Sequence, residues 1–259
     1  MTILPTGTAE QPLLRQLAPG VFARQEVDNM GWVDMGDSIL VVDTLEQPTA
    51  EAAVWQALRE TVGDRPVGWV LNTHTHPDHV ALNPAFERAG AEIINARTRE
   101  LPASGLTVEG KKRSVQMLPM PGCHSHGDCV VWLPAERILF VGDLFGWGLI
   151  PWMGNLTGER KQLIVDTYRR LLDLRPQTLV PGHGPLCGDA ELRRWLDYFL
   201  WLIDQAGARI RAGIKPAEID SKAIPPPPDM LDWWRFRQWK HADSLKKVVK
   251  ALARNRAGL

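Results

Sequence analysis

The chain has 259 residues, and 44% of them are apolar, so it is long enough to bury a sizeable core. The formal net charge is zero and no long basic run occurs, which argues against a nucleic-acid partner. No apolar run is long enough to span a membrane, and residues 1–20 do not have the pattern of a signal peptide. Three cysteines form no disulfide framework, and an odd count suits a reducing compartment. We therefore expect a cytoplasmic protein that does not bind membranes.

Strand-like and helix-like segments alternate along the chain, which predicts an α/β fold. Residues 38–43 (SILVVD) are an apolar run of strand length, and residues 48–62 have apolar side chains at helical spacing before Gly63. The expected strands, in chain order, are 21–23, 31–37, 38–43, 67–72, 92–96, 114–119, 129–133, 137–141 and 178–180. The expected helices are 48–62, 83–89, 158–174, 189–212 and 230–252.

The most informative segment follows the strand expected at 67–72. It places three of the seven histidines and an aspartate within six positions: His74, His76, Asp78 and His79. A structural core gains nothing from so many polar rings, because burying them unpaired is costly. Nitrogen and carboxylate donors in this density suit zinc, iron or manganese. The segment therefore predicts a metal site.

Three further polar motifs also follow expected strands. The sequence PGCHSHGD (121–128) comes after the strand at 114–119, Asp143 ends the hairpin at 129–141, and His183 follows the short strand at 178–180. Loops at strand ends are where a rigid scaffold presents functional side chains. These motifs are therefore expected to meet the histidine segment.

Together the four motifs resemble those of the metallo-β-lactamase superfamily. THTHPDH is similar to its HxHxDH motif, HSHGD to its third-histidine loop, LFVGD to the segment with the bridging aspartate, and VPGHG to the last histidine motif. The resemblance spans roughly residues 20–190. It implies an αβ/βα four-layer sandwich with extra C-terminal helices. We expect a single domain over 1–259, with a core of about 20–190 and a helical extension over 190–259.

The resemblance also implies a site with two divalent metal ions, with zinc preferred and iron or manganese as alternatives. The implied first-metal ligands are His74, His76 and His124; Asp78, His79 and His183 would hold the second metal, and Asp143 would bridge the two. Water shared by two such ions becomes hydroxide near neutral pH and attacks an electrophilic carbon or phosphorus. Asp78 is the catalytic candidate, because it is placed to accept a proton from that water.

Several residues near these motifs have more than one interpretation. Cys123 is inserted before the third histidine, so His126 is an alternative to His124 as a ligand. The Cys123 thiolate could also coordinate a metal, but we interpret Cys123 as an adjacent small residue and not as a ligand. Asp43 either orients a ligand histidine or caps the following segment. His241, in a charged helical segment, is expected at the surface.

Eleven tryptophans are unusual beside two tyrosines. Trp195 and Trp201 fit the packing face of a helix. The segment 146–154 contains Trp147 and Trp152, and with Trp233 and Trp234 it predicts an apolar substrate cleft over the metals. The tryptophan-rich C-terminal segment is equally suited to a dimer surface, so a homodimer is left open.

These observations leave three functional hypotheses. The first is a two-metal hydrolase in which a metal-bridging hydroxide cleaves an ester, thioester or lactone of small size. The alternative is a mononuclear iron oxidoreductase similar to persulfide dioxygenases, and the third is a metal-holding module without turnover. True β-lactamases lack the aspartate found here at Asp143. Glyoxalase II would need basic residues in the C-terminal helices to hold glutathione, and the basic residues there do not match that family's pattern.

Overall fold

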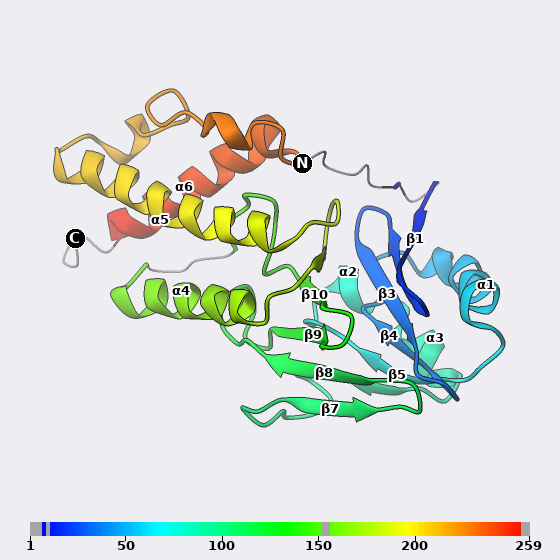
Figure 1. Cartoon of the computed structure of the whole chain (residues 1–259). Coiled ribbons are helices and arrows are strands. Elements are labelled where there is room, and N and C mark those ends of the chain that lie inside the picture. The colour runs from blue at the N-terminus through cyan, green and yellow to red at the C-terminus, as the bar shows by residue number, and fades with distance from the viewer. Residues whose placement is uncertain (1–6, 9–10, 152–155, 255–259) are drawn as a thin grey trace.

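The computed structural model describes residues 7–8, 11–151 and 156–254 (Figure 1). One sheet has six strands in spatial order β1 (Leu13–Ala18), β2 (Val21–Gln25), β3 (Asn29–Asp34), β4 (Ile39–Val42), β5 (Val67–Leu71) and β6 (Glu92–Ile94). The other has five, in the order β11 (Thr178–Pro181), β10 (Ile138–Gly142), β9 (Cys129–Leu133), β8 (Ser114–Pro119) and β7 (Leu106–Glu109). The α-helices are α1 (Glu51–Val62), α2 (Pro77–Val80), α3 (Asn83–Arg88), α4 (Gly158–Asp173), α5 (Asp189–Arg211) and α6 (His241–Arg254).

Both sheets are mixed, and their parallel pairs lie where the chain crosses over through a helix. The strands β4, β5 and β6 pair in parallel, as do β10 and β11, while the remaining neighbours are antiparallel. A parallel connection needs a crossover segment, and α1, α3 and α4 lie in those crossovers. The carboxyl ends of these parallel strands therefore point to a common edge of each sheet.

Alternate side chains of a strand pack into different core clusters, which shows the layers. In β4, Ile39 and Val41 pack with the apolar faces of α1 and α3, while Leu40 and Val42 pack with side chains of the second sheet. The outer face of the second sheet packs on α4, α5 and α6, in a cluster that includes Leu139. Figure 1 shows α4, α5 and α6 gathered on one side of the molecule and α1 and α3 on the other. The fold is the αβ/βα sandwich with C-terminal helices that the sequence predicts.

The C-terminal segment departs from the prediction of one helix over 230–252. A 3-10 turn (Pro228–Met230) and a π-helical turn (Phe236–Lys240) precede α6. Arg235 has φ of 57°, a left-handed conformation that ends any continuous helix at this point. The strands β1 and β7 and the short helix α2 were not predicted either. Their lengths of four to six residues give too little periodicity to detect.

His241 is not at the surface. Its side chain is buried, with one ring nitrogen 3.0 Å from the Tyr198 hydroxyl and the other 2.8 Å from the carbonyl oxygen of Ile224. Each ring nitrogen thus has a hydrogen-bond partner within the protein, in place of the water that would bind it at the surface. Trp195 is fully buried and Trp201 packs partly buried against the same cluster, as expected for packing residues. Within the described residues, no helix is both long and apolar enough to cross a membrane.

Candidate metal centre

The polar motifs meet where strands of both sheets end. His74 and His76 lie in the loop after β5, and His79 lies in α2 directly behind it. Asp143 follows β10, and His183 follows β11. The loop between β8 and β9 brings His124 to the same place, so that the candidate ligands come from both sheets.

Seven side chains form two groups whose donor atoms each lie within 4.8 Å of one another. The first group contains His74, His76, His124 and Asp143, and the second contains Asp78, His79, Asp143 and His183. In the first group, His76 Nδ1 lies 3.1 Å from His74 Nε2 and 2.9 Å from His124 Nε2. Both groups contain nitrogen donors and carboxylate oxygen, which suits a borderline divalent cation.

Asp143 belongs to both groups through different oxygens. Its Oδ1 lies 3.4 Å from Nε2 of His79 and 3.4 Å from Nε2 of His183. Its Oδ2 lies 3.5 Å from Nε2 of His124, on the side of the first group. A carboxylate oriented in this way can join two cation sites.

Two buried atoms at the centre of the second group support a fit to a cation. His79 Nε2 and Asp143 Oδ1 are inaccessible to solvent, and neither makes a hydrogen bond to the residues that the structure describes. Such orphaned polar atoms are rare, because each loses its hydration on burial. A divalent cation bound between them would satisfy both, so the donor set fits a metal.

The two groups differ in their ionisation. In the first, burial and then the neighbouring His79 lower the pKa of His74 to about 2, so its ring is a neutral donor at working pH. In the second, burial lowers the pKa of His183, but the neighbouring carboxylates of Asp143 and Asp78 outweigh it and raise the pKa to about 10. Burial raises the pKa of Asp78, yet the bond from His183 and the charge of His79 bring it down to about 2. Two carboxylates thus favour positive charge in the second group.

Neighbouring groups fix the orientation of two ligand candidates. Asp43 accepts hydrogen bonds from the backbone N–H of Thr73 (2.8 Å) and its hydroxyl (2.8 Å), and its Oδ2 lies 3.0 Å from His79 Nδ1. His183 Nδ1 donates to the carbonyl oxygen of Val27 at 3.0 Å. In both histidines Nδ1 is occupied and Nε2 is directed to the centre. Asp43 therefore orients a ligand candidate, one of the two interpretations left open by the sequence.

The loop with the third histidine is built around Asp128, to which the sequence assigned no role. Its buried carboxylate accepts the backbone N–H groups of Cys123 (3.1 Å), His124 (2.7 Å) and Ser125 (2.8 Å), and the Ser125 hydroxyl (2.5 Å). His126 is exposed and belongs to neither group. The geometry therefore favours His124 over His126.

Cys123 also belongs to neither group of donors. Its side chain is fully buried. Burial raises the pKa of its thiol, which disfavours the thiolate that a metal would need. The structure gives no support to this cysteine as a ligand.

A hollow of about 350 Å³ opens beside the metal groups, a volume suited to a small molecule. His124, Asp143 and His183 form part of its wall. The remaining lining residues come mainly from the segment after β10 and from the C-terminal segment: Val27, Gly146, Leu149, Ile150, Pro151, Trp234, Arg235, Trp239, Lys240 and Lys247. This hollow, hereafter the metal-side pocket, is the candidate substrate site.

The expected tryptophan cleft is only partly correct. Trp234 lines the pocket, but Trp147 and Trp233 do not. Trp147 is 1% exposed, stacks edge-on against Trp233, and donates its indole N–H to the carbonyl oxygen of Pro185 at 3.1 Å. It is therefore a core residue beneath the wall. Trp152 lies outside the described residues.

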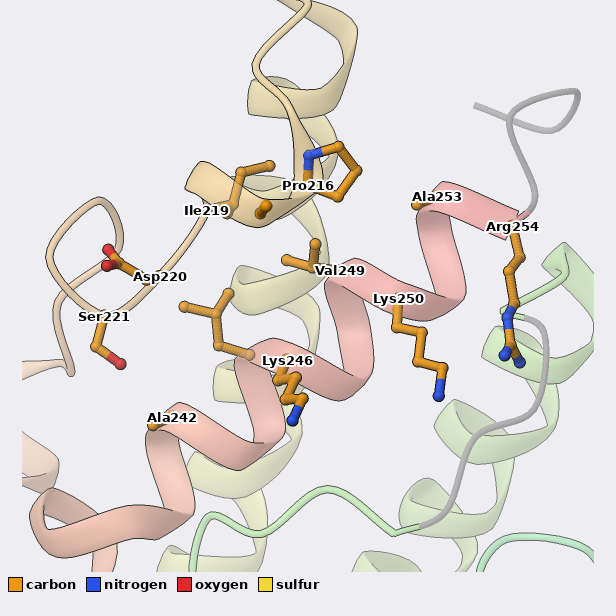
Figure 2. A pocket seen from close by; sticks show the side chains of 12 residues that line it. Pro216, Ile219, Asp220, Ser221, Ala242, Lys246, Val249, Lys250, Ala253 and Arg254 are labelled. Carbon is orange, nitrogen blue, oxygen red and sulfur yellow. The ribbon is translucent and has the colours of Figure 1, made fainter.

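A larger hollow, of about 640 Å³, lies on α6 against residues 216–221 (Figure 2). Ile219 and Val249 face one another across it, and Lys246, Lys250 and Arg254 follow the helix beside it. Its lining includes none of the seven ligand candidates. It is therefore separate from the metal centre.

The sequence profile of the metallo-beta-lactamase superfamily matches residues 25–102 and 101–183, which is more than half of the chain. The chain belongs to this superfamily. It is 27% identical over 208 residues to the 2,4-dinitroanisole O-demethylase subunit alpha of Nocardioides sp., covering 69% of this chain and 60% of that protein. It is 28% identical to a hydroxyacylglutathione hydrolase of Mesorhizobium japonicum, covering 62% and 65%. The chain thus spans less than two thirds of these relatives. A hydroxyacylglutathione hydrolase of Acidiphilium cryptum is 31% identical, covering 66% and 70%.

Solved structures agree on the fold. An inverting sec-alkylsulfatase from Pseudomonas sp. superposes with a TM-score of 0.70 at 15% identity, covering 96% of this chain and 51% of that one. A metallo-beta-lactamase from Pontibacter korlensis gives 0.58 at 20% identity, covering 73% and 98%. At these identities the likeness shows the shared sandwich alone.

Proposed function

We propose that this protein is a two-metal hydrolase that cleaves an ester, thioester or lactone of a small molecule. The observation that carries the proposal is the position of Asp143, whose two oxygens face two separate groups of histidines. The likeness to hydroxyacylglutathione hydrolases supports hydrolysis as the reaction class. We propose zinc as the native metal, with iron or manganese as alternatives.

We propose a place for each ion from the two groups of donors. His74, His76 and His124 would hold the first cation, Asp78, His79 and His183 the second, and Asp143 would bridge them. When bound, two divalent cations acidify water and polarise the carbonyl that it attacks. In the overall reaction, the water oxygen bonds to the acyl carbon, the bond from that carbon to the leaving oxygen or sulfur breaks, and the leaving group takes up a proton.

Asp78 is proposed as the residue that orients the attacking water and accepts its proton. Its carboxylate lies 3.0 Å from His183 Nε2 and is partly exposed to the solvent side of the site. With a pKa of about 2, it is ionised throughout the working range, so it can accept a hydrogen bond at every relevant pH.

The first test is metal content per chain, measured by plasma mass spectrometry on tag-free protein. Two divalent ions per chain, with turnover of a panel of esters, thioesters and lactones, are expected. A single iron per chain would contradict the two-metal proposal and favour the persulfide-dioxygenase alternative, which oxygen uptake with glutathione persulfide then checks.

The second test is the Asp78→Asn variant, which keeps the size of the side chain. We expect turnover to fall about a hundredfold or more, because a positioned proton acceptor contributes roughly 10²–10⁴-fold. The exposed His126→Gln variant, in the neighbouring loop, is the matched control and should retain wild-type rates. Wild-type turnover in Asp78→Asn, with its metals retained, would contradict the role assigned to Asp78.

A further inference from the structure

Lys240 is a buried cation in the wall of the metal-side pocket. Its side chain is almost fully inaccessible, and Nζ donates one hydrogen bond of 2.7 Å to the carbonyl oxygen of Gly146. Within the described residues, Lys240 has no ion pair at 4.0 Å or less, and the carboxylate of Asp143 in the same pocket acts on it from beyond that distance. Burying an ammonium without a directly paired opposite charge is costly, so its position beside the metal centre calls for an explanation.

The adjacent residues increase the positive charge. Nζ of Lys240 lies 4.0 Å from the ring centroid of Trp234, and the guanidinium of Arg235 lies 4.6 Å from it. Arg235 is exposed and also has no described carboxylate at ion-pair distance. Lys247 differs, because its ammonium is paired with Asp243 at 2.9 Å. The pocket therefore holds two cations without a carboxylate partner on one indole ring.

The backbone holds this arrangement in an unusual conformation. Arg235 is left-handed (φ 57°), and its carbonyl accepts the N–H groups of both Trp239 and Lys240 at 3.3 Å, in a π-helical turn. Trp234 packs closely on the loop of His183, where a Cβ added at Gly184 would lie 2.6 Å from Trp234 Cε3. Such turns are concentrated at functional sites. Here the turn fixes the cations relative to a ligand loop.

We propose that Lys240 and Arg235 bind a carboxylate of the substrate, while Trp234 and Trp239 contact its carbon chain. This inference rests on the proposed hydrolase function and names its substrate class: an ester, thioester or lactone that also carries a carboxylate. The bound anion supplies the charge that the two cations lack, and an arginine presents a fork suited to carboxylate oxygens. Burial and then Arg235 lower the pKa of Lys240 to about 7, and a carboxylate beside it would restore the charged form.

The test uses two esters with six-carbon acyl groups that differ in charge. The first is 4-nitrophenyl hexanoate, which is neutral, and the second is mono-4-nitrophenyl adipate, which ends in a carboxylate. On the metal-loaded protein we expect a lower KM for the adipate ester. Lys240→Met and Arg235→Gln should each raise that KM by about 10- to 100-fold, the range for a lost charge-assisted bond, and alter the hexanoate KM by less than about twofold.

Lys246→Met is the matched control, because Lys246 is exposed on α6 outside the metal-side pocket. It should leave both KM values unchanged. Arg235→Gln keeps the test valid if the buried Lys240→Met variant folds poorly. Equal KM values for the two esters in the wild type, or equal losses on both esters in the variants, would overturn the proposal.

A binding measurement separates this inference from the hydrolase proposal. If neither ester is cleaved, that result contradicts the proposed hydrolase activity on these esters. Calorimetric titration with 6-phenylhexanoate and its neutral amide then still tests whether the protein binds a carboxylate. We expect the wild type to bind the acid at least tenfold more tightly than the amide, and Lys240→Met to lose that preference. An unchanged preference in both variants would assign the carboxylate to the metals alone and overturn the inference.

Discussion

Replacing Asp128 by alanine should unfold the third-histidine loop and weaken the first metal group. The carboxylate accepts three successive backbone N–H groups, those of Cys123, His124 and Ser125, and also the Ser125 hydroxyl. Each hydrogen bond to a charged group contributes roughly 1.5–3 kcal/mol, and a buried donor without a partner adds its desolvation cost. Partial rehydration of the loop offsets part of the sum, so we expect a loss of about 3–5 kcal/mol.

A loss of that size should lower the melting temperature by about 6–20 °C, because about 1 kcal/mol corresponds to roughly 2–4 °C in a chain of this length. Differential scanning calorimetry of metal-free protein isolates this effect from metal binding. Metal content should fall as well, since the backbone that carries His124 is no longer fixed. Asp64→Ala, at an exposed position after α1, is the control and should change the melting temperature by less than about 2 °C. A change of less than about 2 °C in the melting temperature of Asp128→Ala would refute the reasoning.

Three further variants test the geometry of the site. Gly182→Ala places a Cβ against the carboxylate of Asp143 and 2.9 Å from His79 Cε1, so it should lose at least one metal per chain by mass spectrometry. Gly158→Ala, with no atom within 4 Å of the added Cβ, should lose none. Asp43→Asn removes the acceptor for His79 Nδ1 and should weaken metal binding by about 10–100-fold in chelator competition; unchanged affinity would contradict its orienting role. Lys240 has a folded pKa of about 7, below that of the unfolded chain, so above pH 7 the unfolded state binds the extra proton. The stability of the wild type relative to Lys240→Met should therefore rise by about 2 kcal/mol between pH 7 and 9 in urea titrations, and a constant difference would argue against the lowered pKa.

The sandwich and the convergence of the motifs could be predicted because both depend on short-range patterns. A β-branched apolar run such as residues 38–43 is typical of a buried strand in a chain that alternates strands and helices, and polar motifs that each follow a strand are typical of loops that form a site. The resemblance of the four motifs to those of the superfamily indicated which side chains would lie together, and the two donor groups contain the same seven residues. Which of His124 and His126 faces the centre depended on the loop conformation.

The sequence did not predict the roles of several residues, because those roles depend on contacts that exist only in the folded chain. Asp128 lies inside a recognised motif, but its role is visible only once three N–H groups are seen to converge on it. Trp147 was expected in the cleft and lies beneath it, with its ring packed edge-on against Trp233 and its backbone at a positive φ of 54°. Lys240 was expected within one long helix, and the break at Arg235 that turns it into the pocket has no signal in the sequence.

The ligand candidates and the C-terminal pocket wall come from different parts of the sequence, which separates metal binding from substrate selection. All seven ligand candidates lie between His74 and His183, whereas the cations and indoles that line the pocket lie after residue 233. The two parts touch closely where Trp234 packs on Gly184, next to His183. Substitutions in the C-terminal wall should therefore alter KM without altering metal content, except at Trp234, where loss of the ring would also free the His183 loop. Metal content and KM measured together on a Trp234→Ala variant should both change, while in Arg235→Gln only KM should change. A change in metal content for Arg235→Gln would show that the wall and the ligand loops form one unit.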